Sequence, residues 1–172
     1  MKYFALAAAL ALPSGNAFAA GAGNTAAPSK PKCEKGFVYD RKAKGCIRAE
    51  SHLDTDVLYE TVRQLAYAGR YDDAQVVLAV MPQDDDRTLT YLGFTNRKLG
   101  RAALAMDYYS QALAANPGNI LARSYMGQGL VEAGKVADAL AQLRAIRAHG
   151  GTGTWAEASL RKAIATGQTF NY

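Results

Sequence analysis

Three segments of the sequence repeat one pattern, and this repetition constrains the fold more than any other feature. The segments cover residues 65–74, 96–105 and 130–139. Each contains a glycine followed by a basic residue, with an alanine five positions after the glycine. The glycines are separated by 31 and then by 34 residues. A period of this length with helical patterning predicts stacked helix pairs, because one pair cannot bury its apolar face alone.

The middle repeat, residues 86–119, carries the most specific form of the pattern. Its matching positions are a Leu-Gly pair, two alanines, an aromatic residue and a proline, namely Leu92, Gly93, Ala105, Ala112, Tyr109 and Pro117. These residues resemble the tetratricopeptide repeat, whose unit is a pair of antiparallel helices. Leu89 and Asn96 stand where that family usually has a tryptophan and a large tyrosine-like residue.

The flanking repeats, about residues 55–85 and 120–153, keep fewer of these positions. Pro82 shortens the first, and the third has Arg123 where tryptophan is usual. Residues 154–166 continue the helical patterning and predict a capping helix. The resemblance therefore implies an all-α, tetratricopeptide-like right-handed superhelix of antiparallel helix pairs. It would cover residues 53–167 and precede a tail over residues 168–172.

Small residues explain how one such pair would pack. Gly93 and Ala105 lack bulk, so the two helix backbones can approach to about 8–10 Å. The seam is expected to be filled by Leu92, Leu104, Leu113 and one of the two tyrosines Tyr108 and Tyr109. The three repeat glycines stand where the first helices should end, since a left-handed residue there bears no steric penalty when it is glycine.

The N-terminal residues have the pattern of an export signal. Lys2 precedes an apolar stretch of ten residues, and small residues follow at Ala17 and Ala19. This pattern predicts a signal peptide over residues 1–19, cleaved between Ala19 and Ala20. We therefore expect the protein to be periplasmic or secreted.

Residues 20–32 are rich in small and polar residues and contain two prolines. They cannot bury enough apolar surface to offset the entropy of ordering, so we interpret them as a flexible linker. No apolar run in the sequence reaches the roughly 18 residues of a membrane-spanning helix. An integral membrane span is therefore not expected.

A short segment bounded by the only two cysteines covers residues 33–48. Apolar character begins at Phe37, gives way to a polar turn and resumes at Ile47, which predicts a small hairpin. Export to an oxidising compartment predicts a disulfide between Cys33 and Cys46. In the chain-entropy model a loop of this size gains on the order of 3 kcal/mol from the cross-link.

The positive charge of the chain is concentrated around this hairpin. Residues 30–48 hold seven basic and two acidic residues, whereas the chain from residue 49 onward holds twelve basic and thirteen acidic ones. One interpretation is an electrostatic anchor for anionic lipid or an acidic wall polymer. The other is a solvated turn that keeps the protein soluble. Nucleic acid is not an expected partner of an exported protein.

The sequence shows no recognisable catalytic constellation. His52 and His149 lie in different segments, without the converging groups that a catalytic triad needs. The acidic run at 84–86 lacks the ligand spacing of a calcium loop and is expected at a helix N-terminus. The Gly-rich residues 150–154 lack the Gly-Lys-Ser/Thr ending of a phosphate-binding loop. We therefore expect no enzymatic activity, no metal and no cofactor.

Stacked helix pairs leave a concave groove lined by the first helix of each pair. Helical spacing predicts the side chains that point towards this groove. They are Tyr59, Arg63 and Tyr67 in the first repeat, Thr90, Tyr91, Phe94, Arg97 and Lys98 in the second, and Ser124, Tyr125 and Gln128 in the third. Aromatic and arginine side chains often anchor interfaces, although the tyrosines could equally pack between repeats.

These features favour a non-enzymatic scaffold or adaptor that binds a peptide or a partner helix through the groove. The alternative is a cell-envelope binder, whose basic hairpin attaches to anionic polymer or lipid while the repeats only assemble. Self-association is compatible with both interpretations. The family's best-known peptide clamp uses paired lysines and asparagines, and Tyr59 and Arg63 replace that pattern, so its specificity is not expected here.

Overall fold

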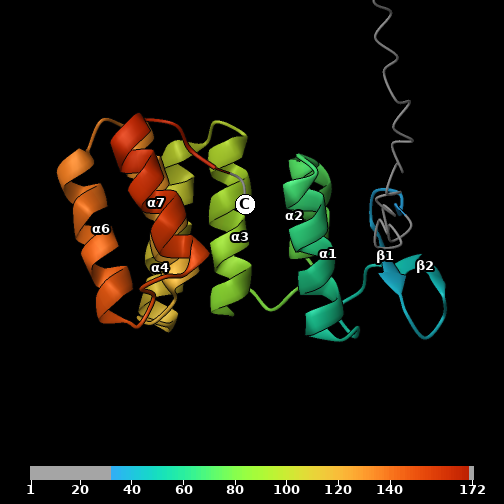
Figure 1. Cartoon of the computed structure of the whole chain (residues 1–172). Helices are drawn as coiled ribbons and strands as arrows, with labels where there is room; N and C mark the ends of the chain where they lie inside the picture. Colours follow the sequence, from blue (N-terminus) through green and yellow to red (C-terminus); the bar gives the residue numbers. More distant parts are fainter. Residues whose placement is uncertain (1–31, 171–172) are drawn as a thin grey trace, which may run out of the picture.

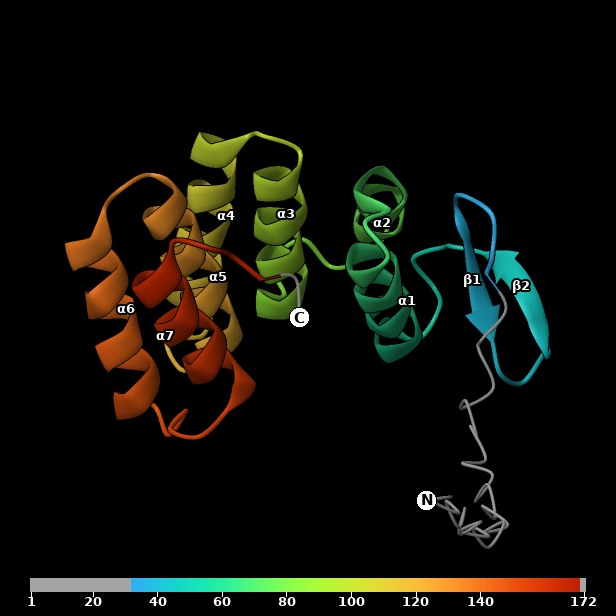
Figure 2. The same ribbon diagram turned by 45° about the horizontal axis from the view of Figure 1, so that its top comes forward.

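A computed structural model describes residues 32–170 of the chain, in which a two-stranded hairpin precedes seven helices (Figure 1). The predicted signal peptide, almost all of the predicted linker and residues 171–172 lie outside the described residues. Figures 1 and 2 show the helices as a row of neighbouring pairs with the hairpin at one end. None of the described helices is both long and apolar enough to cross a bilayer.

The hairpin consists of β1 (Phe37–Asp40) and β2 (Gly45–Arg48), paired antiparallel with Tyr39 opposite Cys46. The predicted disulfide is confirmed, and it joins Cys33 to Cys46 across a Cα–Cα distance of 5.7 Å. Val38 on β1 is completely buried and belongs to the same apolar core as the first helices. The hairpin therefore rests on the helical array and is not a separate unit.

The helices form three consecutive pairs and a final single helix. The pairs are α1 (Thr55–Tyr67) with α2 (Tyr71–Leu78), α3 (Asp86–Lys98) with α4 (Ala102–Ala115), and α5 (Ile120–Glu132) with α6 (Val136–Ala148). The capping helix predicted from the sequence is α7 (Trp155–Thr166), which packs on α5 and α6. The order and pairing of the helices agree with the repeats inferred from the sequence.

Local signals set where the first helices begin and end. Asp85 caps α3, its carboxylate accepting from the main-chain N–H groups of Arg87 and Thr88, as expected for the acidic run. Gly69, Gly100 and Gly134 follow α1, α3 and α5 with φ angles of +73°, +81° and +72°. A side chain is strained at such angles, which explains why glycine recurs at this place in all three repeats.

The seam between α3 and α4 is closed by Tyr109. A Cβ atom added at Gly93 would lie only 2.5 Å from Cε1 of Tyr109, so the ring fills the space that the glycine leaves. The buried side of α4 is made by Ala105, Tyr109 and Ala112. The expectation that Leu104 fills this seam is wrong, because it is 42% exposed and lies one position off the buried stripe.

Candidate functional site

The predicted groove residues fall into two groups. Those on α1, together with Lys98 at the end of α3, are half-buried and reach the surface. The others are buried in α3 and α5, namely Thr90, Tyr91, Phe94, Arg97, Ser124, Tyr125 and Gln128. The α1 side chains therefore line an accessible face, whereas most of the α3 and α5 side chains form the floor beneath it.

The floor is a row of aromatic rings that crosses four helices. Tyr91 of α3 contacts Tyr59 of α1 and Tyr125 of α5 edge-to-face, with ring centroids 5.6 Å and 6.2 Å apart. Tyr125 contacts Trp155 of α7 in the same way at 6.1 Å. Edge-to-face pairs at these distances stabilise packing beyond the area they bury. Tyr91 and Tyr125 thus pack between repeats, which is the second of the two roles considered for the tyrosines.

Hydroxyl groups connect the floor to the accessible α1 side chains. The hydroxyls of Tyr67 and Tyr91 lie 3.1 Å apart, and Nε of Arg63 donates to the Tyr67 hydroxyl over 3.3 Å. The Arg63 guanidinium also lies against the Tyr59 and Tyr67 rings, 5.9 Å and 5.6 Å from their centroids. Arg63 is thereby held in one orientation while its side chain keeps 31% exposure.

The buried phenols of α3, α4 and α5 stay neutral at physiological pH. Burial raises the pKa of Tyr91 and of Tyr125 far above its ordinary value. Burial also raises the pKa of Tyr109 to about 12, although the neighbouring Arg97 works in the opposite direction. A phenol with such a pKa does not supply a tyrosinate base near neutrality. These three phenols therefore act as hydroxyl groups and aromatic rings, not as tyrosinate bases.

Arg97 is the most deeply buried charged side chain of the face. Its Nη1 donates to Oε1 of Glu132, at the end of α5, over 2.6 Å, and only 2% of the Arg97 side chain is exposed. Its stem lies over Gly129, where an added Cβ would come within 3.0 Å of Cδ of Arg97. Within the described chain, Nε and Nη2 of Arg97 have no hydrogen-bond partner. Arg97 thus ties α3 to α5.

The segment after α7 returns to this face. In Figures 1 and 2 it runs from the end of α7 back towards α3. The Thr169 hydroxyl donates to Oε1 of Glu132 over 2.6 Å, and the main-chain N–H of Phe170 donates to Oε1 of Gln128, also over 2.6 Å. Gln128 was expected in the groove, whereas Glu132 was missed. Its position four residues after Gln128 on the same helix is the signal that could have found it.

The electrostatics of Glu132 follow from these contacts. Burial acts to raise the pKa of its carboxyl group, but the Thr169 hydroxyl and the Arg97 guanidinium outweigh burial and lower it below the ordinary value. Burial and the charge of Arg97 lower the pKa of nearby Lys98. The carboxylate of Glu132 is therefore ionised at neutral pH and is a strong hydrogen-bond acceptor on this face.

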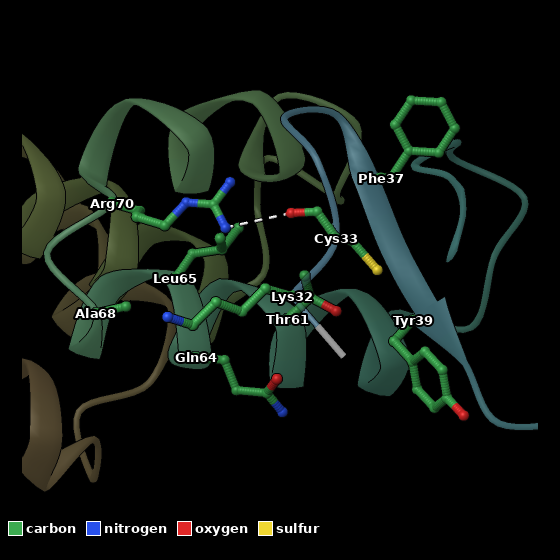
Figure 3. A pocket seen from close by; sticks show the side chains of 9 residues that line it. All are labelled: Lys32, Cys33, Phe37, Tyr39, Thr61, Gln64, Leu65, Ala68 and Arg70. Atoms are coloured by element: carbon green, nitrogen blue, oxygen red, sulfur yellow. Dashed lines mark hydrogen bonds between the residues drawn. The ribbon is translucent and has the colours of Figure 1, made fainter. Parts of the chain in front are cut away.

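Apart from this face, a hollow lies between the hairpin and the first helix pair (Figure 3). It encloses about 310 Å³ and was not anticipated from the sequence. Arg70 closes one side, donating through Nη1 to the main-chain oxygen of Cys33 over 3.2 Å and through Nε to Asp73 over 2.6 Å. The remaining lining is mixed apolar and polar, from Lys32, Phe37, Tyr39, Thr61, Gln64, Leu65 and Ala68.

Neither the face nor the hollow has the groups of a metal site. Across residues 32–170, no three His, Cys, Asp or Glu side chains are placed to hold a metal ion together. His52 lies beside Glu50, with Nδ1 3.2 Å from its carboxylate, and His149 lies near Arg123, with 3.4 Å between the side-chain nitrogens. These two histidines belong to opposite ends of the array and do not converge.

Comparisons with known proteins address the class of the helical part. The family model described as tetratricopeptide repeat matches residues 97–163. Among solved structures, the Yersinia enterocolitica type III secretion translocator chaperone SycD is similar, with a TM-score of 0.55 and 19% sequence identity. The similarity covers 66% of this chain and 85% of that one. No curated protein sequence matches the chain significantly.

The stacked pairs and the face across them define a protein–protein interaction module, because such arrays present extended surfaces to other chains. Residues 97–163 of the module are similar to the tetratricopeptide repeat. The predicted fold is confirmed, because seven helices in a tetratricopeptide-like array follow the short disulfide-closed hairpin that was also predicted. The similarity to SycD concerns this fold.

Proposed function

We propose that the protein is a non-enzymatic adaptor that binds a peptide segment or a helix of a partner protein on the face formed by α1, α3 and α5. The observation that carries this proposal is the row of Tyr59, Arg63 and Tyr67. These side chains are held by contacts with the aromatic floor and still reach the surface. Preorganised aromatic and arginine side chains are the common anchors of protein interfaces.

The test is affinity capture of partner proteins with a matched pair of arginine variants. Arg63→Ala removes the cation from the face. Arg144→Ala removes an exposed arginine from α6, the outer helix, which is not part of the face. We expect Arg63→Ala to weaken the capture of specific partners about tenfold or more, as for the loss of an interface anchor, and Arg144→Ala to leave capture unchanged. Equal capture by both variants would exclude the α1 part of the face.

We propose further that this adaptor works in the periplasm or after secretion. The support is the signal-like pattern of residues 1–20 together with a disulfide, which persists mainly in oxidising compartments. N-terminal sequencing of the protein from fractionated cells tests the proposal. A mature chain starting at Ala20 in the periplasmic fraction is expected, and an uncleaved chain in the cytoplasm would contradict it.

The hairpin supports a second candidate function, attachment to an anionic envelope surface. All basic side chains of residues 32–48 are exposed, namely Lys32, Lys35, Arg41, Lys42, Lys44 and Arg48. Co-sedimentation with vesicles containing anionic lipid, and with purified cell wall, tests this function over a salt series. Binding that weakens steeply with salt would support it, because exposed charges are screened within about 10 Å at 0.1 M salt. Salt-independent sedimentation would exclude it.

The type III secretion translocators named with SycD are not among the partners proposed here. At 19% identity the two chains share the fold, and binding residues cannot be transferred between them on that basis. The side chains of this chain's own α1–α3–α5 face determine the class of partner that it binds.

A further inference from the structure

We infer that Gln128, Glu132 and Lys162 form a subsite for an extended segment with a hydroxyl residue followed by an aromatic residue. The chain's own Thr169 and Phe170 fill this subsite until a partner segment of the same chemistry displaces them. This inference rests on the proposed function, because it names the kind of segment that the α1–α3–α5 face binds.

The first element of the subsite recognises main chain. Oε1 of Gln128 accepts the N–H of Phe170 over 2.6 Å. The Gln128 side chain is fully buried, and its Nε2 lies 3.5 Å from Oγ of Ser124, which in turn lies 3.1 Å from Oγ of Ser159 on α7. The amide is therefore fixed with its oxygen towards the bound segment. A main-chain contact of this kind accepts any residue except proline, which has no N–H.

The second element recognises a hydroxyl group. Oε1 of Glu132 accepts the Thr169 hydroxyl over 2.6 Å, and the same oxygen accepts Nη1 of Arg97 over 2.6 Å. The Glu132 side chain remains 40% exposed, so a ligand can reach it, while the buried guanidinium keeps it in place. A hydroxyl donating to an ionised carboxylate makes a stronger bond than one between neutral groups. Serine or threonine is therefore favoured at this position.

The third element recognises an aromatic ring. Nζ of Lys162 on α7 lies 4.8 Å from the centroid of the Phe170 ring, within the range of a cation–π contact. Two consecutive residues of the segment make these contacts. Thr169 contacts Glu132, and Phe170 contacts Gln128 and Lys162. Together they specify the order hydroxyl residue, then aromatic residue.

The connection to α7 explains why the chain's own segment takes this place. Gly167 ends α7 in the left-handed conformation, with φ of +72°. This angle turns the chain off the helix axis, and Thr169 follows two residues later. A segment tied by so short a connection has an effective concentration in the millimolar range. A partner segment therefore competes with an occupant that is always present but held by few contacts.

The test is fluorescence polarisation with a labelled, amidated peptide that has the sequence of residues 166–170. The full chain is compared with an opened chain carrying Thr169→Ala and Phe170→Pro, which removes the hydroxyl, the ring and the N–H of the internal segment. We expect the opened chain to bind the peptide at least about tenfold more tightly, because binding no longer has to displace the occupant. Equal binding by the two chains would overturn the inference.

Two further comparisons make the test specific. In the opened chain, Glu132→Gln should weaken peptide binding about tenfold or more, whereas Glu50→Gln, at an exposed glutamate before α1, should not. On the ligand side, a peptide with valine in place of threonine should bind at least about tenfold less well to the opened chain. Since this comparison leaves the protein unchanged, it holds even where Glu132→Gln disturbs the fold. Indifference to the valine would overturn the inference.

Light scattering distinguishes an internal occupant from one supplied by a second copy. We expect a monomer for both the full and the opened chain. A dimer of the full chain that Phe170→Pro dissolves would overturn the assignment of an internal segment.

The failure of this inference can be told apart from the failure of the proposed function. If the opened chain does not bind the peptide while partner capture still depends on Arg63, only this subsite is excluded. If the opened chain binds the peptide but partner capture does not depend on Arg63, the α1 part of the proposed function is excluded instead.

Discussion

Gly93 of α3 and Tyr109 of α4 are in direct contact, and the place of a Cβ atom on Gly93 lies 2.5 Å from the tyrosine ring. Tyr109 is completely buried, so the ring cannot swing out into solvent to make room for a side chain. The middle repeat therefore depends on the absence of a single side chain. This relationship leads to the first prediction.

Gly93→Ala should destabilise the protein by about 1–3 kcal/mol, the usual cost of overpacking a core. In an unobstructed helix the same change would stabilise by about 1 kcal/mol, so the sign of the effect tests the contact. The measurement is urea unfolding followed by circular dichroism. The exposed site Gln111→Ala on α4 is the control and should change stability by less than about 0.5 kcal/mol. A gain in stability for Gly93→Ala would contradict the close contact between Gly93 and the Tyr109 ring.

Arg97→Ala should lower the free energy of unfolding by about 2 kcal/mol. Breaking a fully buried ion pair costs roughly 3–5 kcal/mol, and the cost here should be smaller because the Glu132 side chain is 40% exposed. Arg144→Ala, on the outer helix, serves as the control in the same urea titration. If the two variants lose equal stability, Arg97 does not hold α3 to α5.

The contribution of Glu132 to stability should depend on pH. Its pKa is lowered in the folded state, so its stabilising effect is present above the unfolded value of 4.5 and is lost as pH falls through the folded pKa. The difference in stability between the wild type and Glu132→Gln should therefore stay level from pH 8 to pH 5 and shrink at lower pH. Urea titrations at each pH measure it. A difference that grows on acidification would contradict the assigned ion pair.

Removing the disulfide by Cys33→Ala and Cys46→Ala should loosen the hairpin first. The two cysteines are 13 positions apart, and closing a loop of this size is worth about 3 kcal/mol in the chain-entropy model. Hydrogen exchange should become faster over β1 and β2, while α5 keeps its protection. Unchanged exchange in the hairpin would mean that Val38 and its neighbours in the core suffice to hold it.

The sequence predicts the fold through local signals and predicts the face less well. Gly69, Gly100 and Gly134 mark the same helix end in each repeat, and such signals are readable because each depends on a few neighbouring residues. Tyr91 and Tyr125, which helical spacing predicts for the groove, lie buried in the aromatic row. Helical spacing does not reveal that neighbouring repeats cover the two rings, since burial depends on contacts between residues far apart in the chain.

The occupant of the face was not predictable for the same reason. Residues 168–170 appear in the sequence only as part of a short tail after the last helix. Their place follows from the turn at Gly167 and from partners on α5, about 40 residues earlier, such as Glu132. The prediction for Leu104 was wrong in the opposite direction. Its apolar side chain suggested burial, but Leu104 lies beside the buried stripe of α4 and is exposed.

Site-specific photo-crosslinking in cells tests the central claim most directly. A photoreactive residue is placed at Tyr67, on the α1 face, and in parallel at Leu140, which is exposed on the outer helix α6. The account predicts covalent adducts with a partner protein at position 67 and none at position 140. Adducts at position 140 without any at position 67 would contradict it, because the partner would then bind outside the α1–α3–α5 face.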